Sequence, residues 1–283
     1  MDLRIFNIKN LHNPNNFCNF VLLTLKIYYM SILPVKKSEK RTQNPKNLIM
    51  FGLPKVGKTT VLAELPNCLT IDLEDGTRYI EGYNVSANNY VDLYKIAKAL
   101  KEEEHNYKFI AIDTVTALEK IALDLACKRY TESPVGKNFT GSGNDILKLP
   151  NGSGYYWVRL AMEEIIGWFE KVAENLILVG HVKDKMLNEQ GTELNVKSLD
   201  LQGKVSSILS AKSDAICYVY RDPETQNLMC NFGNNNSVLT GARMEHLAGK
   251  TILLAERVEK DDHFDIITHW EHIYPSLKNE ARD

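Results

Sequence analysis

Two glycines, a lysine and a threonine follow a short apolar run at a spacing that suits a phosphate group. Residues 47–60 read NLIMFGLPKVGKTT, and the pattern G-x-x-x-x-G-K-T extends from Gly52 to Thr59. The apolar run predicts a buried strand and residues 61–65 predict a helix, which together form the context that a phosphate-binding P-loop requires. Glycine lets successive backbone N–H groups point into one anion-sized nest, and the helix N-terminus adds a partial positive charge. The pattern favours a nucleoside triphosphate site over an ordinary glycine-rich turn.

The side chains of this loop suit both phosphate and metal. Lys58 can reach the β- and γ-phosphates, and the hydroxyl of Thr59 can ligate Mg²⁺. ATP and Mg²⁺ are therefore the expected ligand and cofactor. The expected nucleotide-binding residues are Gly52, Leu53, Pro54, Lys55, Val56, Gly57, Lys58, Thr59 and Thr60.

A carboxylate at the tip of a neighbouring strand should complete the Mg²⁺ shell. Asp113 ends the apolar run FIAID, so we expect it to ligate the metal together with Thr59. The alternative role for Asp113 is to cap the helix that follows it.

Hydrolysis also needs a group that orients or deprotonates water. Asp113 is followed by Thr114, which cannot do this, so the group must come from elsewhere in the chain. Glu74 lies just beyond the second predicted strand, at the sheet edge where ligands bind in such folds, and is the expected catalytic residue. Asp72 and Asp75 are competitors, although Asp72 is expected to lie within the strand. A solvated acidic turn is the alternative interpretation.

Histidines occur at two places that invite a chemical role. His181 ends the fourth predicted strand at the same edge, where a polar side chain could sense the γ-phosphate through a hydrogen bond. A capping or packing role for His181 is equally compatible with the sequence. His269 and His272 have no cysteine or third histidine nearby, so we expect them to be surface residues rather than metal ligands.

From residue 47 onward, apolar runs alternate with amphipathic segments, which is typical of a parallel sheet flanked by helices. Strands are predicted at residues 48–51, 68–73, 108–113 and 176–180, and helices at 91–104, 114–130, 155–174 and 205–210. Further predictions are a hairpin about residues 189–191, antiparallel edge strands at 215–220 and 227–232, and a last short strand at 251–255. The predicted fold class is α/β with a mostly parallel sheet.

The length, charge and cysteine content limit the classes of protein to which this chain can belong. The 283 residues suffice for one large α/β domain, and 25% charged with 44% apolar residues is ordinary for a globular protein. A net charge of −2 excludes a generally basic surface, so any nucleic-acid contact must come from local patches. The five cysteines show no CxxC spacing and predict neither disulfides nor a zinc site, which favours a reducing, cytoplasmic setting.

The two ends of the chain differ from the middle. Residues 1–46 are expected to form a flexible N-terminal extension, residues 47–256 the nucleotide-binding domain and residues 257–283 a C-terminal tail. The apolar segment 20–33 is short and is interrupted by Lys26, so no membrane span is expected.

The composition break near the N-terminus also motivates a hypothesis about the natural start of the protein. Translation would begin at Met30, with the preceding residues an upstream extension. Mass spectrometry of the native protein would contradict this by finding peptides from residues 1–29.

Four motifs in sequence order resemble the RecA-type core, namely GLPKVGKT, IDLE, FIAID and LILVGH. More narrowly, the chain resembles the phage-encoded AAA-type nucleotide-binding proteins, which are RecA-like ATPases associated with single-strand annealing recombination. The supporting segments are IDLEDGTRYI, LPNGSGYYWVR, DLQGK and SDAICYVYRD, and the likeness covers residues 47–256. It implies a RecA-like P-loop core in which Glu74 is the catalytic glutamate and a polar sensor ends the fourth strand. His181 departs here from the glutamine of RecA itself.

The resemblance also implies single-stranded DNA as a partner, bound by the loops after the third and fourth strand–helix units. Between Lys128 and Arg159 there are five basic and two acidic residues with aromatic residues interleaved, which suits a sequence-tolerant single-strand binder. The aromatic residues are Tyr130, Phe139, Tyr155, Tyr156 and Trp157. Tyr156 and Trp157 open a predicted helix and could instead only pack. The loop at residues 183–203 is a weaker candidate because acidic residues balance its lysines.

A RecA-like ATPase further implies a homo-oligomer, ring or filament, in which a cation from the next subunit completes the site. The candidate cations are Lys204, Arg221, Arg243, Lys250 and Arg257. Two other functions stay open. One is a P-loop nucleotide or small-molecule kinase, although the long polar loops carry few of the arginines that its lid would need. The other is a protein that binds ATP as a switch without hydrolysing it.

Overall fold

The computed structural model describes residue 37 and residues 43–189, 192–233, 237–259 and 264–280. The chain divides into two units, residues 1–41 and residues 42–283, and the architecture below is that of the second unit. The predictions for residues 1–36, including the apolar segment and the start at Met30, lie outside the described residues.

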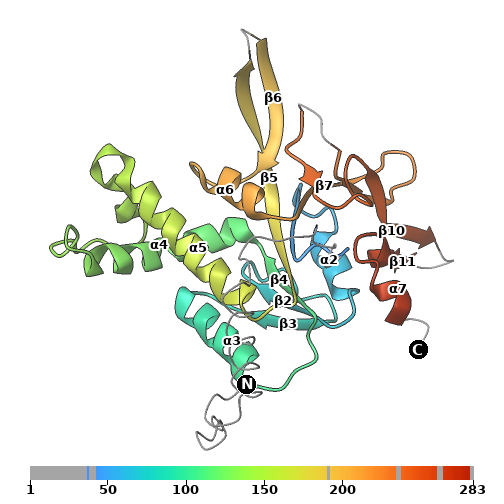
Figure 1. Cartoon of the computed structure of the whole chain (residues 1–283), viewed down its shortest axis with the longest axis horizontal. Coiled ribbons are helices and arrows are strands. Elements are labelled where there is room, and N and C mark those ends of the chain that lie inside the picture. Colours follow the sequence, from blue (N-terminus) through green and yellow to red (C-terminus); the bar gives the residue numbers. More distant parts are fainter. Residues whose placement is uncertain (1–36, 38–42, 190–191, 234–236, 260–263, 281–283) are drawn as a thin grey trace, which may run out of the picture. The chain divides into compact units, whose positions relative to one another are not determined.

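A mostly parallel sheet forms the centre of this unit (Figure 1). Its strands follow the order β11-β10-β8-β7-β1-β5-β4-β2-β3, with β6 paired to β5 and β9 paired to β7. The parallel part consists of β1 (Asn47–Gly52), β2 (Cys68–Asp72), β3 (Tyr83–Ser86), β4 (Phe109–Asp113), β5 (Asn175–Glu189) and β7 (Ala215–Arg221). The antiparallel part consists of β6 (Thr192–Leu199), β8 (Leu228–Asn231), β9 (Gly241–Ala242), β10 (Thr251–Glu259) and β11 (Phe264–Thr268). The predicted fold class, mostly parallel with antiparallel strands near the C-terminus, is confirmed.

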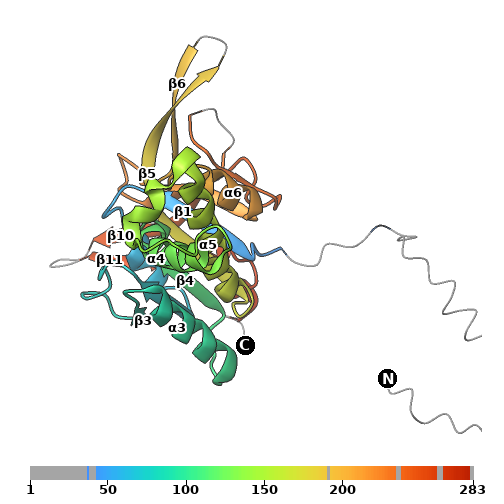
Figure 2. The same ribbon diagram turned by 90° about the vertical axis from the view of Figure 1, so that its left-hand side faces the viewer.

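Helices cover both faces of this sheet. One face, toward the viewer in Figure 2, carries α3 (Tyr90–Glu102), α4 (Val115–Glu132) and α5 (Ser153–Glu170). The other face carries α2 (Lys58–Ala63), the short turn η5 (Trp270–His272) and α7 (Leu277–Glu280). In β1, Ile49 and Phe51 pack with the first group of helices. The alternate residues Leu48 and Met50 pack with α2. Because all four side chains are fully buried, β1 is a rigid base for the loop that follows it.

Strand β5 is longer than the sequence predicts. The predicted strand stops at residue 180 with His181 at its end, but β5 continues through His181 and pairs with β6 in a hairpin that projects from the sheet (Figure 1). Gly180 permits β6 to pack closely against β5, because a Cβ on Gly180 would lie 2.2 Å from Cδ1 of Leu199 in β6. The hairpin itself was predicted and closes at the pair Glu189↔Thr192, while the two residues of its tip lie outside the described ones.

The edges of the sheet also differ from the prediction. Strand β7 is not an edge strand, because it pairs in parallel with β1 on one side and antiparallel with β8 on the other. The edges are β3 and β11, which were not predicted. Both are only half-buried, so neither has the continuous apolar run that identifies an interior strand.

The predicted C-terminal tail belongs to the core of this unit. The predicted boundary at residue 256 falls inside β10, and β11 pairs beside that strand. Trp270 is 2% exposed, and its indole Nε1 donates a hydrogen bond of 2.8 Å to the carbonyl of Val61 in α2. Tyr274 is fully buried and packs edge-on against Phe109. The end of the chain therefore supports the helix that follows the P-loop.

The polar section between α4 and α5 is folded rather than open. It forms two short 3-10 turns, η3 (Gly143–Lys148) and η4 (Pro150–Gly152), and the fully buried Ile146 anchors η3 in the core. Gly154, the second residue of α5, packs directly against this turn, since a Cβ there would lie 1.9 Å from the carbonyl oxygen of Ile146. The remaining short helix is α6 (Val205–Lys212), close to its predicted bounds.

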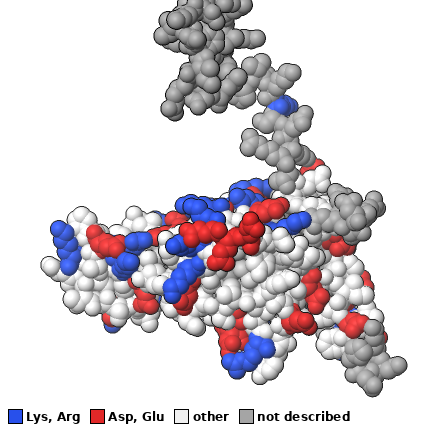
Figure 3. All heavy atoms as spheres, turned by 90° about the horizontal axis from the view of Figure 1, so that it is seen from below, with Lys and Arg blue, Asp and Glu red and all other residues white. Residues whose placement is uncertain are grey.

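The surface carries charges of both signs. On the face in Figure 3, basic and acidic side chains are interspersed, so neither sign dominates there. None of the helices in the described part of the chain has both the length and the apolar character needed to span a bilayer.

Candidate functional site

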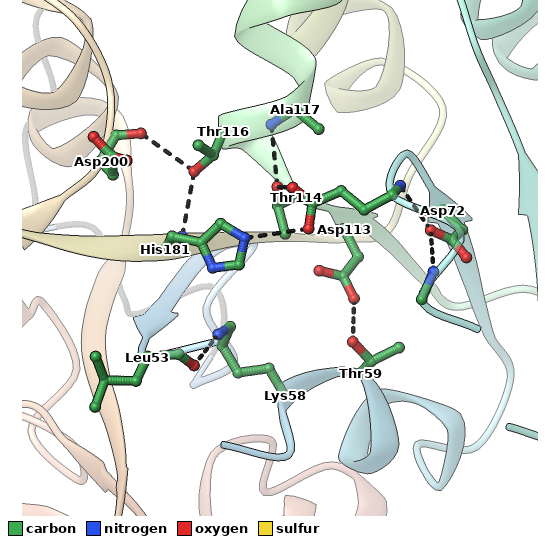
Figure 4. Close-up of polar contacts among 12 residues, drawn as sticks. Leu53, Lys58, Thr59, Asp72, Asp113, Thr114, Thr116, Ala117, His181 and Asp200 are labelled. Atoms are coloured by element: carbon green, nitrogen blue, oxygen red, sulfur yellow. Dashed lines mark hydrogen bonds and ion pairs between the residues drawn. The ribbon is translucent and has the colours of Figure 1, made fainter. Parts of the chain in front are cut away.

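The P-loop follows β1 and leads into α2. The side chain of Lys58 points back toward the backbone of the loop (Figure 4). The Nζ of Lys58 donates to the carbonyl oxygens of Gly52 at 3.1 Å and Leu53 at 2.8 Å. Burial lowers the pKa of Lys58, and the negative charges of Asp113 and Glu74 oppose that shift. A phosphate group entering the loop would offer this ammonium a charged partner in place of two neutral carbonyls.

Two glycines of the motif are required by the backbone around them. A Cβ on Gly52 would lie 2.3 Å from the carbonyl oxygen of Val219 in the neighbouring strand β7. Gly57 has a φ of +115°, which side chains rarely allow, and a Cβ there would lie 3.0 Å from Nη2 of Arg221. The spacing of glycines in the sequence is therefore the spacing that the fold needs.

Asp113 at the end of β4 meets Thr59 at the start of α2. The Thr59 hydroxyl donates a 2.6 Å hydrogen bond to Oδ2 of Asp113, which is 6% exposed. Burial raises the pKa of Asp113, while the Thr59 hydrogen bond and the Lys58 charge act in the opposite direction. A hydroxyl and a carboxylate in contact are the oxygen ligands that Mg²⁺ prefers, so this pair fits the predicted metal role.

Asp72, the last residue of β2, shapes the turn that carries Glu74. Its carboxylate accepts hydrogen bonds from the backbone N–H groups of Glu74, Gly76 and Thr77 and from the Thr77 hydroxyl, at 2.7 to 3.2 Å. Burial alone would raise the pKa of Asp72, but these hydrogen bonds together lower it. Asp72 is thus committed to the turn and is not free to act on a substrate.

Glu74 is held between two side chains. Its Oε1 accepts a hydrogen bond of 3.1 Å from the hydroxyl of Thr114, and its Oε2 lies 3.2 Å from Nε2 of His181. The Glu74 side chain is 38% exposed and His181 is 24% exposed, so the pair lies at the surface of the site rather than in the core. The solvated acidic turn, the alternative interpretation of this stretch, would leave Glu74 without these contacts.

The backbone of His181 belongs to a second chain of contacts (Figure 4). Its N–H donates to Oγ1 of Thr116 at 3.3 Å, and the Thr116 hydroxyl in turn donates to the carbonyl of Asp200 at 3.2 Å. The N–H of Asp200 returns to the His181 carbonyl at 2.9 Å. The start of α4, the middle of β5 and the end of β6 are thereby joined at one point.

The P-loop, the turn after β2, the end of β4 and His181 together line one cavity of about 580 Å³, within the range of about 300 to 1,000 Å³ that is usual for ligand sites. The lining residues are Pro54, Lys55, Gly57, Lys58, Thr59, Thr60, Asp72, Glu74, Gly76, Ile80, Asp113, Thr114 and His181. The residues expected to act on metal, water and the γ-phosphate, namely Lys58, Thr59, Glu74, Asp113 and His181, all line this cavity. Three of the nine P-loop residues, Gly52, Leu53 and Val56, do not line it.

Two residues act in this cavity in ways that the sequence does not predict. Thr114 cannot activate water, but its hydroxyl holds Glu74. Asp72 is not a rival of Glu74, because its carboxylate builds the turn that carries Glu74. The signal available for Asp72 was its place at the end of a strand, directly before a turn containing Gly76 and Thr77.

Comparison with known families bears directly on this cavity. Residues 44–251 match a family described as AAA domain. The chain belongs to this AAA-domain family. This AAA-domain protein is accordingly a P-loop NTPase by family, which implies nucleotide binding, usually with Mg²⁺.

Other comparisons add little to the family assignment. No curated protein matches this AAA-domain chain. Among solved structures, it is similar to one titled "Crystal structure of the RadB recombinase", with 12% identity, 75% of this chain and 88% of that chain covered, and a TM-score of 0.41. A similarity of this size adds nothing to what the cavity and the family show.

The five candidate cations fall into two groups. Arg221 donates to the carbonyl of Gln226, Arg243 pairs with Asp214, and Arg257 lies over the ring of Phe264. Lys204, at the start of α6, and Lys250, just before β10, are exposed.

The predicted DNA-binding aromatics also divide. Trp157 packs against Tyr130, and Tyr130 packs against Phe139, so these three rings build the α4–α5 region itself. Tyr155 and Tyr156 on α5 are 45% and 49% exposed. The guanidinium of Arg159 lies 5.1 Å above the Tyr156 ring, a pairing that leaves both groups near the surface. Of the other basic residues there, Arg129 is bound by Glu164 and Glu132, and Lys148 by Asp145.

Proposed function

We propose that this protein is a cytoplasmic, RecA-like ATPase whose nucleotide state controls binding of single-stranded DNA in phage-type recombination or replication. The observation that carries the proposal is the pairing of Glu74 with His181 in the cavity that contains the P-loop lysine. A carboxylate held by a strand separate from the one bearing Asp113 is the arrangement that the resemblance to RecA-type ATPases implies.

Each residue has a proposed task in hydrolysis. Lys58 and the loop amides bind the phosphates. Thr59 and Asp113 would hold Mg²⁺, which supplies charge neutralisation at the phosphates when bound. Glu74 orients a water molecule in line with the γ-phosphate or accepts a proton from that water. Thr114 and His181 hold the two oxygens of Glu74, so its carboxylate enters the reaction already oriented.

The same contacts supply a route from the nucleotide to the hairpin. A γ-phosphate beside Glu74 would offer the His181 imidazole a second acceptor in place of the Glu74 carboxylate, and His181 lies in β5, which continues into the hairpin. Thr116 and Asp200 tie this point to the end of β6. Glu119 of α4 adds a second tie, because its carboxylate accepts a 2.8 Å hydrogen bond from the N–H of Gln202.

Single-stranded DNA is proposed to lie along the exposed start of α5. Tyr155 and Tyr156 offer ring faces for base stacking, and Arg159 offers charge for phosphate. Tyr155 also lies beside Gly203, since a Cβ on that glycine would be 3.8 Å from the ring. This places the aromatic surface next to the segment that follows β6, where the nucleotide-dependent route ends.

The lining of the cavity supports hydrolysis over kinase chemistry. A kinase would cover the phosphates with arginines, whereas none of the described residues that line the cavity is an arginine, and its lysines are Lys55 and Lys58. In a proposed homo-oligomer, Lys204 and Lys250 are better placed than the three arginines to reach a neighbouring site, because the arginines have contacts within their own chain.

The test is steady-state ATP hydrolysis with and without single-stranded DNA, for the wild type and for Lys58→Ala. We expect DNA to stimulate turnover of the wild type and Lys58→Ala to lose nucleotide affinity and turnover together. Lys101→Ala, an exposed lysine on α3 that does not line the cavity, is the control and should retain both.

Three outcomes would contradict the proposal. Turnover that requires a small-molecule acceptor would indicate a kinase. Tight ATP binding without turnover, with or without DNA, would indicate a switch. Unchanged nucleotide affinity in Lys58→Ala would contradict the claim that the P-loop binds the nucleotide.

A further inference from the structure

A cluster of imidazole and carboxylate groups lies on the C-terminal side of the sheet, outside the nucleotide cavity. His269, Glu271 and His272 each offer one ligand atom, and these three atoms lie within 4.8 Å of one another. Oε1 of Glu271 is the meeting point, 3.4 Å from Nδ1 of His269 and 3.8 Å from Nε2 of His272. None of the three residues lines the nucleotide cavity.

The outer nitrogen of each imidazole faces an acceptor. Nδ1 of His272 lies 3.1 Å from the carbonyl oxygen of Leu253, which can only accept, so that nitrogen carries the hydrogen. Nε2 of His269 is buried, lies 3.4 Å from Oε1 of Glu256 and has no other polar partner among the described residues. A carboxylate on that side favours the hydrogen there as well.

In this arrangement, the imidazole nitrogens that face Glu271 carry no hydrogen. With hydrogens on the outer sides, Nδ1 of His269 and Nε2 of His272 both present a lone pair toward the same carboxylate oxygen of Glu271. Three acceptors facing one another repel unless a cation lies between them. Outer partners that fix the tautomer and orientation of each imidazole are also what surround the histidine ligands of metal ions.

We propose that His269, Glu271 and His272 bind one divalent transition metal ion of the zinc class, with Glu256 and the Leu253 carbonyl orienting the two imidazoles. Tetrahedral zinc with bonds of about 2.0 to 2.1 Å places its ligand atoms about 3.3 Å apart, close to the two distances from Glu271. Imidazole ligands favour zinc, copper or nickel over magnesium and calcium, so this site would be distinct in chemistry from the Thr59–Asp113 pair. Three protein ligands leave a fourth position for water.

The position of the cluster indicates what the metal would do. Glu256 belongs to β10, His269 follows β11, and the other two ligands belong to η5. Trp270 lies between the ligands in sequence and anchors α2 through the Val61 carbonyl. A metal here would fix the C-terminal turn and so support the helix behind the P-loop, without entering the nucleotide site.

The test uses the full-length protein after treatment with a chelator. Co²⁺ is titrated into wild type, Glu271→Gln, His272→Gln and the control His105→Gln, with excess Mg²⁺ present to occupy the P-loop. We expect one equivalent of Co²⁺ to give visible d–d absorption without a thiolate charge-transfer band, and Zn²⁺ to displace it. Zn²⁺ in large excess over its dissociation constant should raise the thermal midpoint of the wild type by about 4 °C or more.

Glu271→Gln preserves the shape of the side chain, and it should weaken Co²⁺ and Zn²⁺ binding at least tenfold and abolish the thermal shift. His272→Gln should do the same, and His105→Gln should behave like the wild type. Circular dichroism without metal identifies variants that are folded. Absence of stoichiometric binding by the wild type, equal affinity in folded Glu271→Gln or His272→Gln, or a thiolate band in the cobalt spectrum would each overturn the proposal.

Discussion

Oε2 of Glu74 lies 3.2 Å from Nε2 of His181, although 107 positions separate the two residues in the chain. The contact joins the turn after β2 to the middle of β5, two strands that are not neighbours because β4 lies between them. It places the proposed water-activating group and the proposed γ-phosphate sensor in direct contact. A change in the position of one side chain therefore alters the contact that orients the other.

Removal of the imidazole should therefore impair turnover more than binding. In His181→Ala, Glu74 keeps Thr114 as a partner but loses the contact at Oε2, and we expect kcat to fall about 10- to 100-fold with little change in nucleotide affinity. The stimulation of hydrolysis by single-stranded DNA should fall as well, because the proposed route to the hairpin begins at His181. His105→Ala, far from the cavity lining, is the control. An unchanged kcat and DNA response in His181→Ala would contradict the sensor role.

Asp72→Asn tests the turn that carries Glu74. The substitution removes the charge that four donors share, so we expect the free energy of unfolding to fall by about 1 to 3 kcal/mol and kcat to fall with it. Asp222→Asn is a matched control, because Asp222 holds the turn after β7 through bonds from Glu224 and Thr225 outside the nucleotide cavity. It should leave kcat unchanged. A wild-type kcat in Asp72→Asn would contradict the claim that Asp72 positions Glu74 for catalysis.

The same carboxylate has a defined pH dependence. The pKa of Asp72 is lower in the folded protein than its ordinary value of about 3.9. The stability contributed by its charge is thus fully present above that ordinary value and is lost as the pH falls through the lowered pKa. We expect the difference in unfolding free energy between the wild type and Asp72→Asn to be constant near pH 7 and to shrink below about pH 4. Denaturant titrations across this range measure it, and a difference that grows in acid would have the wrong sign.

Trp270→Phe tests whether the C-terminal segment supports the P-loop helix. The variant loses the indole N–H that the Val61 carbonyl accepts and leaves that carbonyl unpaired, so we expect a loss of about 1 to 3 kcal/mol in unfolding free energy and a higher KM for ATP. Trp168→Phe is the control, since Trp168 packs against Tyr94 on the opposite face of the sheet. If Trp270→Phe retained both stability and KM, the contact with α2 would be incidental.

Tyr156→Ala tests the proposed DNA surface. Loss of one stacking ring should weaken binding of a fluorescent oligothymidylate about tenfold or more, measured by anisotropy with ATP present. Tyr79→Ala is the control, because Tyr79 is 93% exposed but lies on the turn between β2 and β3. Equal losses in both variants, or none in Tyr156→Ala, would exclude a specific role for the start of α5.

How much of this site could be predicted depended on the range of the contacts involved. The P-loop and Asp113 are recognisable because strand, loop and helix follow one another directly in the chain. Glu74 and His181 were predicted to share an edge because parallel strands bring their ends together, and their contact agrees with that expectation. The continuation of β5 beyond His181 was missed, since the apolar run stops at residue 180 while the hairpin is held by its partner strand.

Other features depend on contacts that leave no local pattern. The Trp270–Val61 bond spans 209 positions, so the sequence made residues 257–283 look like a tail. His269 and His272 were expected to be surface residues because the sequence near them contains no cysteine and no third histidine. The carboxylate of Glu271 and the fold of η5 complete their surroundings, and neither is visible as a histidine–cysteine spacing.

The most direct measurement separates binding from turnover in Glu74→Gln. Its nucleotide dissociation constant and kcat should be compared with those of the wild type and of Asp75→Asn, an adjacent acidic residue paired with Arg78 instead. We predict that Glu74→Gln binds ATP within about threefold of the wild type while kcat falls about 10²- to 10⁴-fold, and that Asp75→Asn changes neither. Wild-type turnover in Glu74→Gln would contradict the claim that this carboxylate activates water.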